Sequence, residues 1–186
     1  MKISYLGALL LSLILPSTAL AHNFVQHQRV PDIGINDKGE LILTADKFSY
    51  QNWNSARLPG KVRVIQHIAG RSSSKEMNAA LIESIKAAKL PHARYQTTTI
   101  VNTDDAIPGT AMFVRSNIES NKKLYPWSQF IVDSNGIAKK AWQLQSDGSA
   151  IVVLDKQGRV RFAKDGTLTL DETHQVITLV KFLLKE

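Results

Sequence analysis

The residues of this sequence with the clearest chemical potential lie in one short loop, where Gly70 and Arg71 precede Ser72, Ser73 and Ser74. Serine hydroxyls, a permanent guanidinium charge and the free N–H groups at the start of a following helix favour an anion or a peptide carboxylate. The loop is therefore a predicted ligand-binding site. The same serines also suit helix capping, which requires no ligand.

One more polar side chain is expected beside this loop. Asp104 follows a predicted strand over residues 96–102, at what should be the same edge of the sheet as the loop. This edge is where α/β folds place their sites. Asp104 also suits a helix cap or a turn, so both roles stay open for it.

A hydrolase that uses a loop serine is the alternative chemical interpretation. His67 lies five residues before Ser72, and Asp104 supplies a carboxylate, so a nucleophile, a base and an orienting group are present by residue type. However, the sequence lacks the Gly-x-Ser-x-Gly motif that exposes a nucleophilic serine on a strand-to-helix turn. A binding module is therefore the preferred prediction.

Composition removes several classes of function. The chain has no cysteine, so it carries no thiolate for thiol–disulfide exchange or peroxide reduction. Its 23 basic and 16 acidic residues give a net charge of +7, but they are interspersed, which argues against nucleic-acid binding. No cofactor is expected. The one weak metal candidate is His22, whose imidazole would chelate copper together with a new amino terminus.

The first 21 residues have the pattern of a secretory signal peptide. Lys2 supplies a positive charge, residues 6–15 form an apolar run, and Ala19 and Ala21 form an Ala-x-Ala cleavage pattern. We expect cleavage after Ala21 and export of residues 22–186. Because the apolar run is short for a membrane span, no stable membrane insertion is expected after cleavage.

Hydrophobic periodicity predicts the elements that hold the loop in place. Residues 62–68 form an apolar, β-branched run typical of a central strand. After the loop, apolar residues repeat at helical spacing as Met77, Leu81, Ile85 and Ala88. The spacing of Ser73 and Glu76 predicts a capping box that opens this helix.

The rest of the chain predicts one α/β domain over residues 22–186. An N-terminal β-hairpin is expected to turn at Asp37-Lys38-Gly39. The other expected elements are helices over residues 111–124, 137–142 and 171–185, a strand over residues 129–133, and a hairpin of residues 150–154 and 160–163.

Four runs of sequence resemble the YtfJ family of periplasmic proteins, namely residues 53–58, 60–71, 97–109 and 125–136. The order of hairpin, buried strand, loop and helix is also similar to the thioredoxin-like redoxins. The resemblance covers nearly all of residues 22–186. It implies a periplasmic protein with a thioredoxin-like three-layer sandwich, a mixed central sheet, helices on both faces and an N-terminal hairpin. It implies no particular activity.

The differences from working redoxins are also informative. Redoxins place a cysteine in the loop before this helix and a cis-proline opposite it. Here the loop offers serines, and the proline position resembles Ser149, just before a predicted strand over residues 150–154. The resemblance therefore implies that Ser149 lies at the rim of the candidate ligand-binding site. A serine hydroxyl is far less acidic than a thiol and needs an adjacent base. The sequence therefore predicts a redox-inactive module that binds a periplasmic peptide, protein or small anion.

Overall fold

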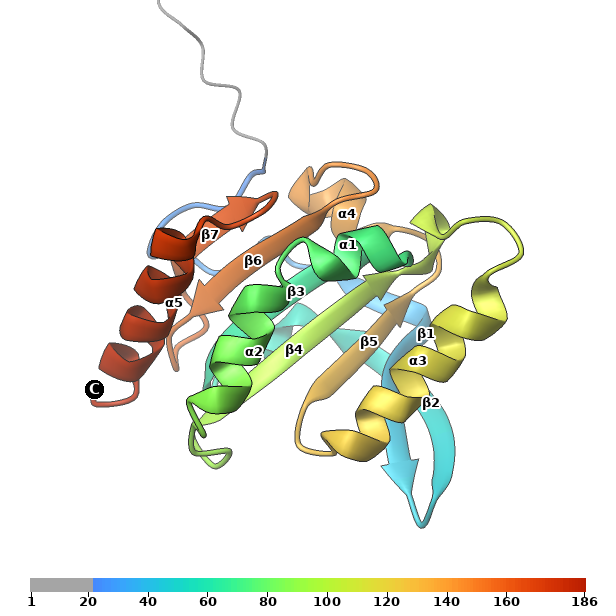
Figure 1. The fold of residues 1–186 in the computed structure, drawn as a ribbon, viewed down its shortest axis with the longest axis horizontal. Coiled ribbons are helices and arrows are strands. Elements are labelled where there is room, and N and C mark those ends of the chain that lie inside the picture. Colours follow the sequence, from blue (N-terminus) through green and yellow to red (C-terminus); the bar gives the residue numbers. More distant parts are fainter. Residues whose placement is uncertain (1–21) are drawn as a thin grey trace, which may run out of the picture.

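A seven-stranded mixed sheet lies at the centre of the protein (Figure 1). The computed structural model describes residues 22–186, so the predicted signal peptide lies outside the described residues. The spatial order of the strands is β2-β1-β5-β4-β3-β6-β7. Strands β3, β4 and β5 pair in parallel, and the other pairings are antiparallel. The strands are β1 (Gly34–Thr44), β2 (Lys47–Asn54), β3 (Val62–Ala69), β4 (Tyr95–Asn102), β5 (Gln129–Asp133), β6 (Ser149–Leu154) and β7 (Val160–Asp165).

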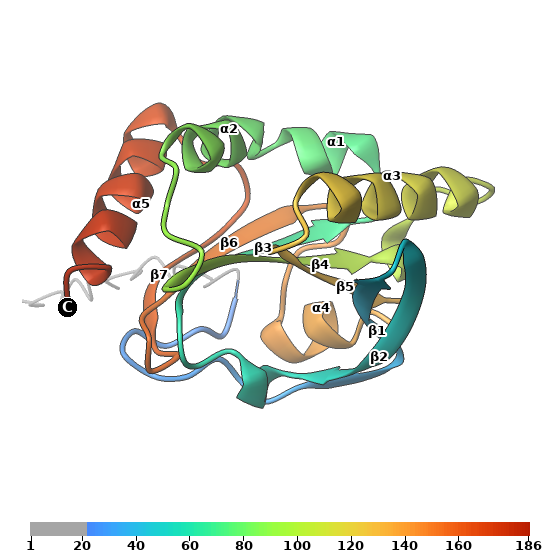
Figure 2. The same cartoon turned by 90° about the horizontal axis from the view of Figure 1, so that it is seen from below.

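Helices cover both faces of the sheet, as predicted (Figure 2). On one face lie α1 (Ser72–Glu76), α2 (Ala79–Ala87), α3 (Ala111–Leu124) and α5 (Leu170–Leu183). On the other face lies α4 (Ile137–Trp142), together with the chain that precedes β1. Two short 3₁₀ turns, η1 (Ser55–Arg57) and η2 (Thr103–Asp105), follow β2 and β4.

Three apolar clusters form the core, because alternate residues of each strand point to opposite faces. The cluster on the α4 face includes Trp53, Ile65 and Trp142. The opposite face carries two separate clusters. One joins β3 and β6 to α2 and α5. The other joins β1, β4 and β5 to α3.

The N-terminal hairpin is present, but the predicted position of its turn is wrong. Strand β1 runs through residues 37–39, and the chain reverses at Ala45 and Asp46, which have φ values of 47° and 60°. Gly39 instead lies at a register irregularity between Ile35 and Glu40, with a φ of 77°. A side chain there would collide with the Gln51 carbonyl oxygen. The glycine therefore marks a β-bulge.

The helix predicted after the loop is divided into α1 and α2 at Met77 and Asn78. The Asn78 side chain is buried and faces the interior. Its Nδ2 donates to Ser149 Oγ at 2.9 Å and to the Gly166 carbonyl at 3.2 Å, and its Oδ1 accepts from Leu168 N at 2.9 Å. This single side chain thus joins the helical segment to β6 and to the loop before α5.

The predicted capping box of Ser73 and Glu76 is not formed. Helix α1 begins after Arg71, and no side chain accepts a hydrogen bond at its N-cap. Ser74 turns inward instead, where its hydroxyl donates to the Asp147 carbonyl at 2.7 Å. The chain does use a capping box, but it lies at the start of α5, between Thr169 and Glu172. The other predicted elements are present, with ends that move by one or two residues.

Candidate functional site

The predicted site residues come from three segments that meet at one edge of the sheet. Arg71 and the serines follow β3, and Asp104 follows β4 in η2. Ser149 is the first residue of β6 and pairs with Ile68, the penultimate residue of β3. Parallel pairing of β3 with β4 and antiparallel pairing of β3 with β6 create this meeting point.

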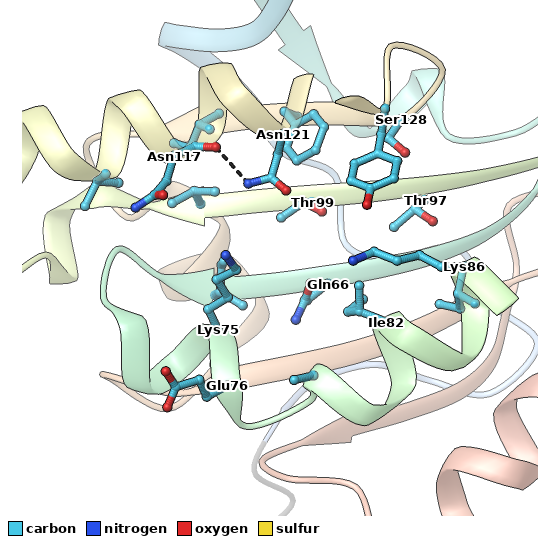
Figure 3. A pocket seen from close by; sticks show the side chains of 18 of the residues that line it. Gln66, Lys75, Glu76, Ile82, Lys86, Thr97, Thr99, Asn117, Asn121 and Ser128 are labelled. Carbon is cyan, nitrogen blue, oxygen red and sulfur yellow. Dashed lines mark hydrogen bonds between the residues drawn. The ribbon is translucent and has the colours of Figure 1, made fainter. Parts of the chain in front are cut away.

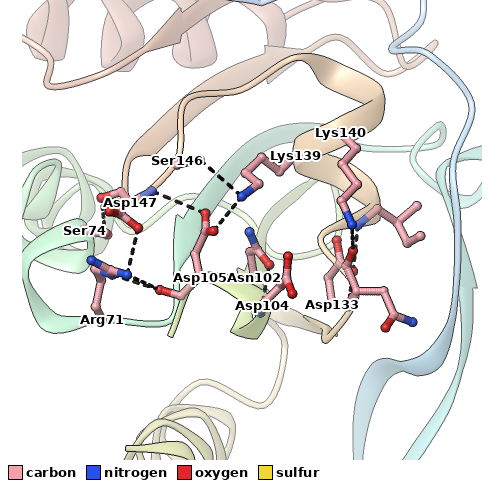
Figure 4. Close-up of polar contacts among 12 residues, drawn as sticks. Arg71, Ser74, Asn102, Asp104, Asp105, Asp133, Lys139, Lys140, Ser146 and Asp147 are labelled. Atoms are coloured by element: carbon pink, nitrogen blue, oxygen red, sulfur yellow. Dashed lines mark hydrogen bonds and ion pairs between the residues drawn. The ribbon is translucent and has the colours of Figure 1, made fainter. Parts of the chain in front are cut away.

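Arg71 is held by its own chain (Figure 4). Its Nε and Nη2 donate to the Asp105 carbonyl at 2.9 and 2.7 Å. Its Nη2 also lies 2.7 Å from Asp147 Oδ1. The guanidinium therefore ties the loop before α1 to the loops after β4 and before β6. Binding of an external anion by Arg71 stays a prediction, and such an anion would share the guanidinium with these acceptors.

Asp105 is the centre of the same network. Its Oδ1 lies 2.5 Å from Lys139 Nζ, and both side chains are mostly buried. Its Oδ2 accepts from Asp147 N at 3.3 Å. Burial alone would raise the pKa of Asp105, but the hydrogen bonds from Lys139 and Asp147 outweigh it and lower that pKa. The carboxylate is therefore charged at neutral pH.

The other predicted residues divide into exposed and buried groups. Ser72, Ser73 and Asp104 are exposed to solvent. Ser74 and Ser149 are buried and hold the loop to its neighbours, through Asp147 and Asn78 respectively. Only the exposed group presents its side chains to the outside, whereas Ser74 and Ser149 hold the loop in place.

His67 is buried on the α4 face of β3, 3% exposed. Burial lowers its pKa to about 4, while Asp105 raises that pKa and Lys139 lowers it, both to a smaller extent. Its Nε2 has no hydrogen-bond partner within residues 22–186. His67 is therefore a neutral, enclosed side chain at pH 7, and no contact on the described chain favours its use as the base of a hydrolase.

The burial of His67 predicts a loss of stability in mild acid. His67 takes up a proton near pH 6.5 in the unfolded chain but only near pH 4 in the folded chain. The contribution of neutral His67 to the free energy of unfolding is therefore complete above pH 6.5 and disappears as the pH falls to 4. The largest loss is about 3 kcal/mol. Urea unfolding at pH 7, 5.5 and 4.5 measures it. The His67→Gln variant should lose less stability over this range, and an equal loss in both proteins would contradict the assignment.

A second feature, which the sequence patterns did not predict, is a groove of about 770 Å³ (Figure 3). We define it as the space between α1 and α2 on one side and α3 on the other, above β3 and β4. One end is the loop of Gly70, Arg71 and Ser72, and the other end is at His92 and Trp127. The predicted loop is thus the mouth of a longer concave surface.

The floor of the groove carries polar side chains, with the two apolar clusters of this face on either side of them. Gln66, Thr97 and Thr99 point up from β3 and β4 between the two helical walls (Figure 3). Gln66 is only 5% exposed, and its Nε2 is buried with no partner within the described chain. An unsatisfied buried donor costs about 1–3 kcal/mol. A ligand that offers an acceptor at this point would recover that cost.

The far end of the groove carries aromatic side chains. His92 stacks on Trp127 with ring centroids 4.1 Å apart. Lys86, which is paired with Glu83 at 2.7 Å, places its Nζ 5.2 Å from the centre of the Tyr125 ring. Trp127 remains 43% exposed. The sequence does contain a signal for this surface: residues 66, 97 and 99 are polar, although they lie on the inward side of otherwise apolar strands. Only the register of β3 and β4 shows that these three residues lie next to one another.

The described residues contain no preformed metal site. Within residues 22–186 there is no group of three or more His, Asp or Glu side chains that could hold an ion. The His22 Nδ1 accepts from Phe24 N at 3.3 Å, and its ring lies 5.1 Å from the Phe24 ring. Copper binding at His22 stays a prediction, because it requires the free amine that cleavage would create.

Solved structures with a similar fold are thioredoxin-like. A putative protein disulfide isomerase from Bacteroides thetaiotaomicron matches with a TM-score of 0.59 and 18% identity, over 89% of this chain and 93% of that one. A putative thiol:disulfide interchange protein from Chlorobium tepidum matches with a TM-score of 0.55 and 13% identity, over 87% and 99%. The predicted thioredoxin-like sandwich is confirmed. At these identities the likeness shows the fold alone.

Relatives by sequence are much closer. An uncharacterized protein, YtfJ, from Escherichia coli strain K12 is 70% identical over 173 residues, which cover 93% of this chain and 94% of the relative. An uncharacterized protein from Haemophilus influenzae is 44% identical over 178 residues, 96% and 97% of the two chains. The model of a bacterial protein family of unknown function, YtfJ_HI0045, matches residues 24–183. The chain therefore belongs to the YtfJ family, and it is a cysteine-free member of the thioredoxin-like fold.

Proposed function

We propose that this chain is an exported binding module that holds its ligand in the groove between α2 and α3. The observation that carries the proposal is the buried Gln66 amide on the groove floor, whose Nε2 has no partner within the described chain. Native proteins rarely leave such a donor unsatisfied, and a bound group that accepts its hydrogen bond is one explanation. The size of the groove also suits a ligand, since binding clefts usually enclose about 300–1,000 Å³.

The predicted loop has a defined part in this function. Arg71 and Ser72 line one end of the groove. Ser74 and Ser149 fix the position of the loop from below, and Ser73 and Asp104 face solvent beside it. A ligand that occupies this end of the groove would therefore lie beside the Arg71 guanidinium and the Ser72 hydroxyl. This is the role that the loop composition predicts.

Export to the periplasm rests on the first 21 residues, whose charge, apolar run and Ala-x-Ala ending match a cleaved signal peptide. Within residues 22–186, no helix has the length and apolar character needed to cross a membrane. The pattern of the first 21 residues is thus what supports a module that works outside the cytoplasm after cleavage.

Photo-crosslinking in periplasmic extract tests the binding role and captures the ligand in the same experiment. We expect a benzophenone amino acid at Asn117, on the α3 wall, to form adducts that mass spectrometry can identify. The matched control carries the same group at Gln157, an exposed residue of the turn between β6 and β7. Adducts at Asn117 and none at Gln157 would support the groove. Equal adducts at both positions, or adducts at Gln157 alone, would contradict it.

A further inference from the structure

We propose that the groove takes an extended peptide with acidic side chains along its α1–α2 side, an inference that rests on the proposed function and names its ligand. The first argument is the floor. Gln66 lies opposite Thr99 in the register of β3 and β4, and Thr97 lies two residues before Thr99 on the same face of β4. Gln66, Thr97 and Thr99 therefore form one polar strip. This strip separates the two apolar clusters on that face.

The strip favours a peptide over a hydrocarbon chain. The buried Gln66 Nε2 has no hydrogen-bond partner within the described chain, and an alkyl chain would leave it without one. An extended peptide presents backbone carbonyl groups at regular intervals of about 3.3 Å per residue. Such a peptide would supply a carbonyl oxygen as the acceptor that Gln66 lacks, while neighbouring side chains would contact the apolar parts of the walls.

The walls differ in charge. The α1–α2 side contributes Arg71, Lys75, Lys86 and Lys89 against Glu76 and Glu83. Lys75 and Lys89 have no ion pair within residues 22–186. By contrast, none of the α3 residues that line the groove in the described chain is charged; they are Phe113, Val114, Asn117, Ile118 and Asn121.

This asymmetry sets the pattern of the peptide. Successive side chains of an extended chain point to opposite sides. A peptide that alternates acidic and apolar residues would place its carboxylates against Lys75 and Lys89 and its apolar side chains against Phe113 and Ile118. Such charge complementarity chiefly provides specificity. The length of β4, eight residues or about 25 Å, is enough for about seven peptide residues.

Fluorescence anisotropy tests the inference. The probe is a fluorescein-labelled heptapeptide, blocked at both ends, that alternates aspartate and leucine. We expect it to bind at least tenfold more tightly than the matched peptide that alternates lysine and leucine. The Lys75→Glu variant should weaken binding of the acidic peptide at least tenfold. The control Lys181→Glu, at an exposed position of α5, should leave it within twofold.

A floor variant separates binding from folding. Gln66→Leu removes the unpartnered amide, so it should keep or raise the unfolding midpoint and yet weaken the acidic peptide at least fivefold. Thr99→Val serves as a second floor variant if the first folds poorly. Retained affinity in the floor variant that folds would overturn the inference, as would equal binding of the acidic and basic peptides.

The remaining outcomes separate this inference from the proposed function. Binding of laurate in the groove, with no binding of the acidic peptide, would overturn the peptide assignment and leave the groove as a binding site. Adducts at Asn117 with no peptide binding would have the same meaning. If the photo-crosslinker at Asn117 forms no adduct and neither peptide nor laurate binds, both the inference and the proposed function are wrong.

Discussion

Replacing Trp142 by alanine is expected to lower the free energy of unfolding by about 3–5 kcal/mol. The indole is fully buried at the end of α4. Its ring packs edge-to-face on Phe24 with centroids 5.3 Å apart, and its Nε1 donates to the Pro31 carbonyl at 2.9 Å. Alanine would leave a cavity and an unpaired carbonyl, and it would release the segment that precedes β1 from the α4 face.

Urea unfolding at pH 7 measures the effect of the Trp142 substitution. Trp127→Ala is the matched control, because its side chain is 43% exposed at the end of the groove. That variant should lose about 1 kcal/mol or less, since much of its surface is already in water. Similar losses in the two variants would show that Trp142 does not anchor the core of the α4 face.

Replacing Asp133 by alanine is expected to cost about 3 kcal/mol, because one buried carboxylate serves several backbone donors. Asp133 ends β5 with no exposed surface. Its Oδ1 accepts from Asn135 N at 3.3 Å and from Ile137 N at 3.0 Å, and its Oδ2 accepts from Ala138 N at 2.8 Å. Gly136, the N-cap of α4, has no side chain to do this and adopts a φ of 62°.

The Asp133→Asn variant distinguishes the loss of hydrogen-bond acceptors from the loss of side-chain packing. Asp133→Asn keeps the shape and one acceptor oxygen, so its loss of stability should be about half that of Asp133→Ala. Chemical denaturation and amide hydrogen exchange in α4 report both effects. If the two variants were equally unstable, the number of accepted hydrogen bonds would not explain the role of Asp133.

The sequence patterns predict the elements that depend on local order. Apolar runs identify β3 and β4, and helical spacing identifies α3 with both of its ends. The bulge at Gly39 has the sequence pattern of a turn, because both structures place a glycine at positive φ. The break between α1 and α2 has no local signal, since the partners of Asn78 lie 71 to 90 residues further along the chain.

The candidate site likewise has features that the sequence predicts and features that depend on contacts between distant residues. The place of the loop, at a strand end and a helix start, follows from sequence. The acceptors that hold Arg71 do not, because Asp105 and Asp147 reach it from loops that only the completed sheet brings near. The groove could not be predicted for a related reason. Its floor and walls come from β3, β4, α2 and α3, and their inward residues share no local pattern.

The way the segment before β1 is held has a consequence for the order of folding. Asn23 N donates to the Trp142 carbonyl, and Val160 N, at the start of β7, donates to the Gln28 carbonyl. Strand β1 likewise pairs with β5, which lies far along the chain. A chain that emerges from its N-terminal end can form the β1–β2 hairpin early, but the segment before β1 and the other edge of β1 have no native partner until the last third follows. Contacts between residues so far apart in the sequence slow folding, because the long stretch of chain between them must first be brought together.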